Sequence, residues 1–329
     1  MATPHHDIVG IGNAIVDVTS QEDASFLTEN GLVSGSMMLI DAARSDELYR
    51  AMGPGTETSG GSAANTIVGL ASFGARSAFI GKVGGDQLGE VFAHDIRAAG
   101  VTFDVPPASD GPSTGRCLVV VTPDAARTMS TCLGVAGLLH PDDIDVAMVG
   151  HARILFCEGY IWDMPITKQA IRRAMGATRE RGNKVSFTLS DSFCVERHHG
   201  EWLELVDNEI DLLFANEAEI CRLYETEDVW KAIDAVRGRC ELVHVTRSAH
   251  GSVVVTADEI TEVPAAPVEQ LVDTSGAGDL YAAGALYGYL QGFDPAHCAR
   301  LGSAAAAEVI THLGARSLVP MSDLVVTDG

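Results

Sequence analysis

Short apolar runs alternate along the chain with segments whose apolar residues recur at helical spacing. The runs are bounded by glycine or polar residues and predict strands at residues 7–12, 77–82, 153–158, 184–189, 210–215 and 242–246. Strands that alternate with helices in this way are typical of βα units. The pattern therefore predicts an α/β fold, with a mostly parallel central sheet flanked by helices.

The stretch from residue 86 to residue 100 carries a full set of helix signals. Asp86 can cap its first turn, and Gly100 stands where a C-terminal cap belongs. One apolar face at helical spacing is formed by Leu88, Val91, Phe92, Ile96 and Ala99. These signals together predict a helix.

Two stretches, residues 15–55 and 101–133, interrupt the βα rhythm. Alternating runs at 116–122 and 127–131 predict antiparallel strands within the second stretch. We interpret both stretches as one small β subdomain, a lid beside the main sheet. No repeat with a period of 20 to 50 residues and no low-complexity linker is visible, so residues 1–329 are expected to form a single domain.

Composition narrows the class of partner. Of the 329 residues 46% are hydrophobic, enough for a large core, and the formal net charge is −23. Such a charge repels nucleic acid and anionic membranes, so neither is expected as a partner. No apolar run approaches the length of a membrane helix, which predicts a soluble protein. An anionic ligand would need a local binding device.

Two features favour a cytoplasmic location. The first ten residues lack the basic start and apolar core of a secretory signal. The chain has seven cysteines, an odd number that cannot all pair, and no two of them form a CxxC motif. We therefore expect reduced, mostly buried thiols.

The sequence DTSGAGD at residues 273–279, followed by a helical run at 280–290, is the clearest chemical signal. Small residues at the start of a helix leave backbone N–H groups that can bind an anion. Asp279 beside them could accept a proton from an attacking hydroxyl. The alternative is a glycine-rich turn in which Asp279 only complements the helix dipole.

A second signal is SGGSAAN at residues 59–65, before a predicted helix at 64–73. Its paired glycines allow close approach of a ligand, and the Asn65 amide can donate and accept; a plain tight loop is the alternative. Near the N-terminus, residues 10–15 begin like a dinucleotide motif, but Ile15 replaces its third glycine. The chain also lacks GxxxxGK[ST] and the HRD and DFG motifs, which excludes Walker-type NTPases and protein kinases.

Five motifs in a fixed order carry a resemblance to the ribokinase or PfkB family of small-molecule kinases, and they span nearly the whole chain. They are GNAIVD at 12–17, GGSAAN at 60–65, NEAE at 216–219, TRSAHGS at 246–252 and DTSGAGD at 273–279. Within that family, bacterial adenosine kinases are most similar, through MMLID at 37–41, TMSTCLG at 128–134, EGYIW at 158–162 and LSDSF at 189–193.

The resemblance implies a large βα domain with a small β lid, the phosphate acceptor between them and ATP along the C-terminal half of the sheet. It implies that Asp17 binds two acceptor hydroxyls, in a pocket completed by Asn13, Gly60, Gly61 and Asn65. On the nucleotide side it implies contacts from Asn216, Glu219, Thr246, Gly251 and Thr274, with Glu219 reaching Mg²⁺ through water. Gly276, Ala277 and Gly278 would form the anion hole, and Asp279 would be the catalytic base.

We therefore expect an ATP- and Mg²⁺-dependent kinase that phosphorylates a primary hydroxyl, the 5′-hydroxyl of adenosine in the first instance. Arg127 is a candidate for neutralising the transferred phosphoryl group, or else an exposed lid charge. Met38, Cys117 and Tyr160 are candidates for an apolar slot that holds the base, or else plain core residues.

Two other functions stay open at this stage. One is a furanose sugar kinase of the ribokinase or fructokinase type, and the other is a nucleotide-binding module without catalysis. A monovalent cation such as K⁺ beside the loop that begins at Asp273 is also left open, as are the oligomeric state and regulation.

Overall fold

The apolar runs of the sequence form the central strands of the protein, whose residues 6–325 are described by a computed structural model. Six parallel strands are β1 (Ile8–Ile11), β5 (Ser77–Ile80), β8 (Ile154–Glu158), β9 (Lys184–Thr188), β10 (Leu212–Asn216) and β11 (Leu242–Thr246). The antiparallel strands β12 (Ser252–Val255) and β13 (Ile260–Val263) extend the sheet in the order β13-β12-β11-β10-β9-β8-β1-β5. The predicted α/β class and mostly parallel sheet are confirmed.

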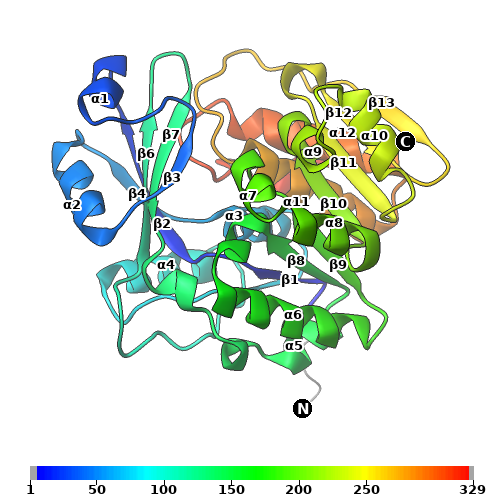
Figure 1. The fold of residues 1–329 in the computed structure, drawn as a ribbon, viewed down its shortest axis with the longest axis horizontal. Coiled ribbons are helices and arrows are strands. Elements are labelled where there is room, and N and C mark those ends of the chain that lie inside the picture. Colours follow the sequence, from blue (N-terminus) through cyan, green and yellow to red (C-terminus); the bar gives the residue numbers. More distant parts are fainter. Residues whose placement is uncertain (1–5, 326–329) are drawn as a thin grey trace.

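Helices cover both faces of this large sheet (Figure 1). One face carries α3 (Ser62–Ser72), α11 (Ala277–Gln291) and α12 (Pro295–Val309), which pack on one another. The other carries α5 (Val146–His151), α6 (Pro165–Arg179), α7 (Ser192–Arg197), α8 (His199–Asn208), α9 (Glu217–Leu223) and α10 (Val229–Val236). Short 3-10 turns occur at Gly134–Leu138, Pro141–Asp143, Gly159–Asp163, Ser248–His250 and Met321–Leu324.

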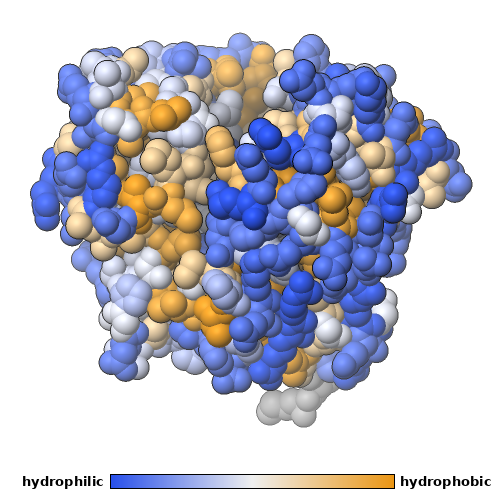
Figure 2. All heavy atoms as spheres, viewed as in Figure 1, coloured by the Kyte–Doolittle hydropathy of each residue, from blue (hydrophilic) through white to orange (hydrophobic). Residues whose placement is uncertain are grey.

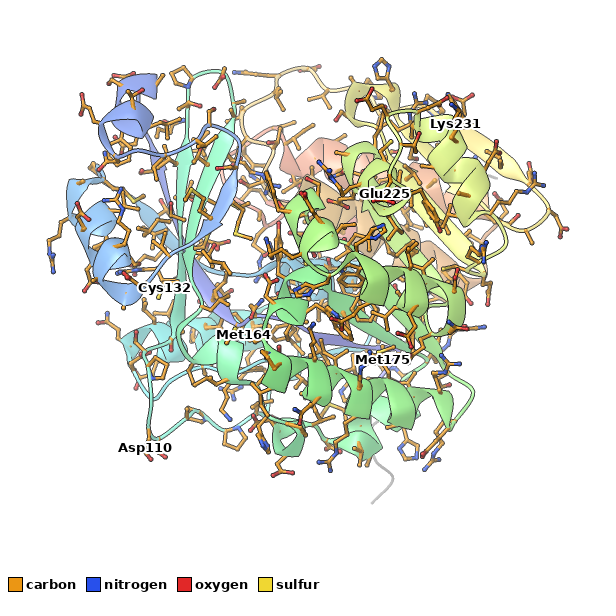
Figure 3. The ribbon with its side chains drawn as sticks, viewed as in Figure 1. Asp110, Cys132, Met164, Met175, Glu225 and Lys231 are labelled. Carbon is orange, nitrogen blue, oxygen red and sulfur yellow. The ribbon has the colours of Figure 1, made fainter. Side chains whose placement is uncertain are left out.

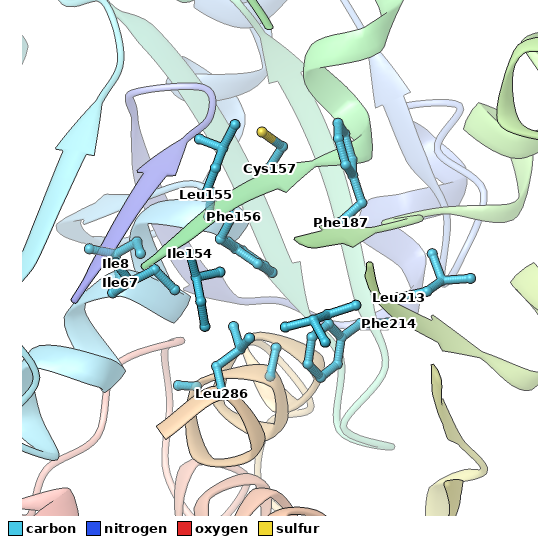
Figure 4. Packing of buried hydrophobic residues seen from close by; sticks show 14 of the residues in the cluster. Ile8, Ile67, Ile154, Leu155, Phe156, Cys157, Phe187, Leu213, Phe214 and Leu286 are labelled. Carbon is cyan, nitrogen blue, oxygen red and sulfur yellow. The ribbon is translucent and has the colours of Figure 1, made fainter. Parts of the chain in front are cut away.

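Burial on both faces explains why the strands are almost continuously apolar. All five residues of β8 are buried. Ile154 and Phe156 point toward the side of Leu286 of α11, while Leu155 points to the opposite face (Figure 4). Apolar side chains thus pack on both faces of the sheet and hold the strand ends in fixed positions.

The predicted helix at 86–100 is confirmed as α4 (Gln87–Ala98). The Asp86 side chain accepts a hydrogen bond from the backbone N–H of Gly89 at 2.9 Å, and Gly100 has a positive φ of 86°. Cap and glycine therefore act where the sequence placed them. Across the described residues 6–325, none of the helices has the length and apolar character needed to cross a bilayer.

A second, smaller sheet stands beside the large one, in the blue and cyan-green part of Figure 1. It has the order β3-β7-β6-β2-β4, formed by β2 (Ile15–Gln21), β3 (Met37–Leu39), β4 (Thr56–Gly60), β6 (Gly115–Val121) and β7 (Arg127–Cys132). Strands β6 and β7 are antiparallel, as predicted. Helices α1 (Ala24–Glu29) and α2 (Ala42–Ala51) accompany the sheet. Cys132 at the end of β7 and Lys231 of α10 mark opposite sides of the molecule (Figure 3).

The small sheet differs in extent from the segments expected to form the lid. Strand β4 continues to Gly60, beyond the expected end at residue 55. Residues 101–108 run along the large sheet instead, where Thr102 bridges to Ala78. Residues 101–108 lie there because Val101 and Phe103 pack into the main hydrophobic core.

The strand order reverses direction between β1 and β8. From β1 the chain moves to β5 on one side, and it later returns to β8 on the other. In open α/β sheets, ligands bind beyond the carboxyl ends of the strands at such a switch point. Asn13 and Glu158 lie there, directly after β1 and at the end of β8.

Candidate active site

A cleft of about 330 Å³ opens between the carboxyl edge of the large sheet and the inner face of the small sheet. On the face seen in Figure 2, apolar surface gathers over the small sheet and along its border with the helices of the large domain. Of the predicted site residues, the cleft is lined by Asn13, Asp17, Gly61, Asn65, Arg127, Asn216, Glu219, Thr246, Thr274, Gly276, Ala277, Gly278 and Asp279. Residues that the sequence scatters over 267 positions thus share one site.

Asp279 occupies the first turn of α11, and two residues of α3 orient its carboxylate. The Ser62 hydroxyl donates to Oδ1 at 2.6 Å, and the Asn65 amide donates to Oδ2 at 2.9 Å. Burial raises the pKa of Asp279, and the hydrogen bonds from Ser62 and Asn65 oppose that rise. The result is a fixed carboxylate that can still take up a proton.

The turn before α11 exposes backbone N–H groups to the cleft. Gly276 precedes the helix with φ +74°, and no side chain of the described residues caps the helix start. A Cβ on Gly276 would lie 2.8 Å from the backbone of Ala315, so only glycine fits. Asp273 stiffens the turn, since its carboxylate accepts from the N–H groups of Ser275 and Gly314. The N–H of Ala277 donates to the Thr274 carbonyl oxygen at 3.4 Å, which leaves the first-turn N–H groups of Gly278 and Asp279 without an acceptor among the described residues. Such groups can bind an anion.

Asp17, on β2 of the small sheet, is the second carboxylate in the cleft. It accepts no hydrogen bond from the residues that the structure describes. Burial raises its pKa to about 7, Arg316 and Arg127 lower it, and Asp279 raises it further. Gly60 lies against this carboxylate rather than on the cleft wall: a Cβ there would be 2.1 Å from Asp17 Oδ2. The absence of a side chain at Gly60 therefore makes room for Asp17.

Glu158 connects the segments around Asn13 and Ala63. The sequence analysis gave this residue no role beyond its place in a motif. Its Oε1 accepts from both the backbone N–H and the amide of Asn13 at 2.8 Å, and its Oε2 accepts from the N–H of Ala63 at 2.7 Å. Burial raises the pKa of this carboxyl to about 7. Glu158 thus links the end of β1 to the start of α3. Gly61, with φ +97°, completes the turn between them.

Arg127 of β7 faces the cleft from the small sheet, and it lowers the pKa values of Asp17, Asp279 and Glu219. Within the described residues it forms no ion pair at contact distance. A guanidinium with no ion-pair partner among the described residues is suited to a phosphate group.

Asn216 and Glu219 line the cleft but are engaged with each other. They form a capping box at the start of α9, in which Glu219 accepts from the N–H and amide of Asn216 at 2.9 and 2.6 Å. Burial raises the pKa of Glu219 to about 7. Within residues 6–325 no group of three or more His, Cys, Asp or Glu side chains is arranged to hold a metal ion.

Gly251 lies off the cleft, in the turn between β11 and β12. A Cβ there would sit 2.1 Å from the carbonyl oxygen of Val263, so the turn itself requires glycine. Arg247, in the same motif, points elsewhere: it pairs with Glu217 at 3.2 Å and stacks on Trp230. Thr246, at the end of β11, and Ser248 are the residues of this motif that line the cleft.

Of the three residues that were candidates for an apolar slot, Met38 was assigned wrongly. Cys117 and Tyr160 line the cleft, whereas Met38 does not. Its neighbours Met37 and Leu39 line the cleft instead. Side chains alternate along a strand, so the two flanking residues of β3 share the inner face.

The cleft lies at the carboxyl edge of a mostly parallel sheet, where α/β enzymes bind small molecules. The chain matches the pfkB family of carbohydrate kinases over residues 30–321 and belongs to that family, so it is a kinase. The crystal structure of adenosine kinase from Sinorhizobium meliloti is 48% identical, with a TM-score of 0.95, over 97% of this chain and 98% of that one. A probable sugar kinase from Rhizobium etli is 42% identical, with a TM-score of 0.95, over 97% of each chain. Adenosine kinase of Saccharomyces cerevisiae is 26% identical over 93% of this chain and 95% of its own.

Proposed function

We propose that this kinase transfers the γ-phosphoryl group of ATP to the 5′-hydroxyl of adenosine, giving AMP and ADP. The observation that carries the proposal is the presence of two carboxylates in one cleft: Asp279 in the first turn of α11, and Asp17, which accepts no hydrogen bond from the described residues. Similarity to the adenosine kinases of S. meliloti and yeast supports the choice of acceptor.

Asp17 binds the ribose in this proposal. Two neighbouring hydroxyls can donate to the two oxygens of one carboxylate, and such bonds are charge-assisted. A carboxyl whose pKa burial raises to about 7 gains most from ligands that donate to its ionised form. Asn13 and Asn65 offer further amide groups, with Asn13 held in place by Glu158.

Asp279 accepts the proton of the attacking hydroxyl. The 5′-oxygen forms a bond to the γ-phosphorus while the bond from that phosphorus to the β–γ bridging oxygen breaks and ADP leaves. Ser62 and Asn65 keep the carboxylate aimed at the acceptor. Backbone N–H groups of the 276–279 turn and the Arg127 guanidinium offset the charge on the transferred group.

Nucleotide contacts are proposed for Asn216 and Thr246, at the ends of β10 and β11, and for Thr274, before α11; all three line the cleft. Mg²⁺ prefers to keep several waters and to bind phosphate oxygens. Both carboxylate oxygens of Glu219 already accept hydrogen bonds from Asn216. Glu219 would therefore act on the metal through water. Bound there, Mg²⁺ would neutralise phosphate charge.

The adenine base is assigned to the apolar wall formed by Met37, Leu39, Cys117 and Tyr160. Burial raises the pKa of the Cys117 thiol to about 12, so it stays a neutral, weakly polar surface. A free sugar would leave this wall uncovered. The wall is therefore the part of the site that separates nucleosides from sugars.

The test is an ADP-release assay with ATP and Mg²⁺, run across adenosine, other nucleosides, ribose and fructose. Adenosine should give the highest kcat/KM, and the product should carry phosphate at the 5′ position. A furanose sugar as the best acceptor would replace the adenosine assignment with the second candidate, which the likeness to the R. etli sugar kinase favours. Absence of turnover with every acceptor would contradict both.

A further inference from the structure

Arg316, in the segment that follows α12, reaches back to the end of β4. Its Nη2 donates to the carbonyl oxygen of Ser59 at 2.8 Å and contacts the Ser59 hydroxyl at 3.2 Å. Its Nε is buried and has no acceptor among the described residues. The guanidinium therefore holds the end of β4, next to Gly60 and Gly61, while its Nε donor has no partner among the described residues.

The same short segment also touches the anion-binding turn. The N–H of Gly314 donates to Asp273 Oδ2 at 2.9 Å, and the backbone of Ala315 lies against Gly276. Residues 314–316 thus contact both the turn before α11 and the end of β4. The turn is part of the proposed phosphate site, and β4 places Gly60 against Asp17 of the proposed acceptor site.

The charge of Arg316 acts on three carboxylates, Asp17 from β2, Asp279 from α11 and Asp95 from α4. Two of them adjoin its partner Ser59: Asp95 accepts from the Ser59 N–H at 3.4 Å, and Asp17 lies against Gly60. Asp17 is also faced by Arg127 and Asp273, and Asp279 by Arg127, Ser62 and Asn65. Burial lowers the pKa of Arg316 to about 10, which leaves it charged at neutral pH. In return, Arg316 lowers the pKa values of Asp17 and Asp279.

We propose that Arg316 is a positioning residue for phosphoryl transfer, which fastens the end of β4 to the turn before α11 and supplies positive charge to Asp17 and Asp279. This inference rests on the proposed function and deepens it. A purely structural arginine would make the same bond to Ser59 without affecting how the carboxylates titrate. The two roles therefore differ in the pH dependence of catalysis.

The experiment compares three variants by kcat/KM for the acceptor at saturating ATP, from pH 5.5 to 9. Arg316→Gln keeps a donor for Ser59 but loses the charge, while Arg316→Lys keeps the charge but loses the planar guanidinium. Arg153→Met is the matched control, because Arg153 donates from Nη2 to the Leu290 carbonyl at 3.0 Å, at the opposite end of β8. Circular dichroism and thermal melting check the fold of each.

For Arg316→Gln we expect the acidic limb of the profile to move to higher pH by about one pH unit. At pH 7 kcat/KM should fall roughly 10- to 100-fold and recover in part at pH 9. Arg316→Lys should keep the limb of the wild type with a raised KM for the acceptor. Arg153→Met should change melting but not the limb.

A uniform fall in kcat/KM with an unmoved limb in Arg316→Gln would reduce Arg316 to a structural link and overturn the inference. If the glutamine variant does not fold, the lysine variant decides, since wild-type kinetics in Arg316→Lys would equally overturn it. Turnover by the wild-type protein distinguishes failure of the proposed function from failure of the role of Arg316. Without turnover of any acceptor the proposed function fails, whereas normal turnover with normal variants contradicts only the role of Arg316.

Discussion

The Ser62 hydroxyl lies 2.6 Å from Asp279 Oδ1, although 217 residues separate the two along the chain. Each residue belongs to the first turn of a helix, α3 and α11, and these two helices pack side by side. Two glycine-rich motifs that looked independent in the sequence therefore form halves of one site. The carboxylate of the second motif is aimed by the hydroxyl and amide of the first.

Asp279→Asn tests the proton acceptor. The amide keeps the shape of the side chain but cannot take the proton, so kcat should fall by about 10²- to 10⁴-fold while acceptor binding changes little. Ser62→Ala is the graded control, since it removes one orienting hydrogen bond and should lower kcat by about tenfold. Rates are measured by ADP release and binding by calorimetry. Wild-type turnover in Asp279→Asn would remove this residue from its proposed role.

Alanine substitutions at Gly278 and Gly276, at the start of α11, should affect different properties: ATP kinetics in the first and stability in the second. A Cβ on Gly278 meets open space in the cleft, so Gly278→Ala should keep the stability and reduce kcat/KM for ATP tenfold or more by crowding the phosphate. Gly276→Ala meets the Ala315 backbone at 2.8 Å with φ +74°, and should lose about 1–3 kcal/mol of stability. Urea unfolding and ATP kinetics check both. Equal ATP kinetics in Gly278→Ala and wild type would mean that the turn binds no phosphate.

The elements that the sequence predicted best are those with local signals. The Asp86 cap, the Gly100 stop and the antiparallel runs of β6 and β7 need no information from elsewhere in the chain. The inner face of β3 could not be assigned in this way. In a three-residue apolar strand, Met37, Met38 and Leu39 fit either phase, and only pairing with β7 selects Met37 and Leu39.

Glu158 and Arg316 show a second limit of sequence reasoning. A buried strand that ends in Glu gives no hint that this carboxylate will bind Asn13, because the bond requires β1 and β8 to be neighbours. Arg316 contacts Ser59 across 257 positions, within a segment that has no regular secondary structure. Roles that depend on long-range juxtaposition appear only when the fold is known.

Asp17 should make the ligand-free protein less stable at alkaline pH. Its native pKa is raised to about 7, so between about pH 4 and pH 7 the native state holds more protons than the unfolded chain. Stability from this group is therefore greatest below pH 4 and is lost as the pH rises through 7. Asp17→Asn removes that loss, and it should be about 2 kcal/mol more stable than wild type at pH 8, with little difference at pH 4.

Urea unfolding of both ligand-free proteins at the two pH values gives the measurement. Glu158 and Glu219 carry similarly raised pKa values but are present in both proteins, so the comparison isolates Asp17. A stability difference that does not depend on pH would contradict the burial of an ionisable carboxyl at this position.

The small sheet should close over the acceptor. Excluding water from the transferred phosphoryl group is a common reason for kinase lids, so ATP hydrolysis without acceptor should be slow. Hydrogen exchange in residues 15–60 and 115–132 should slow when adenosine binds, while exchange in α6, which lies on the far side of β8 and β9, serves as the internal control. Unchanged exchange in the small sheet at saturating adenosine would argue against closure.

The acceptor itself is tested through Asp17 and the ribose hydroxyls. Losing one charge-assisted hydrogen bond inside a closed site costs on the order of 1.5–3 kcal/mol, so 2′-deoxyadenosine should lose roughly 10- to 100-fold in kcat/KM. Asp17→Ala should lose at least as much with adenosine, and the two losses should not add, because both remove the same contact. Ribose probes the apolar wall of Met37, Leu39 and Tyr160. If ribose is phosphorylated as efficiently as adenosine, that wall holds no base, and the nucleoside assignment fails while the kinase assignment stands.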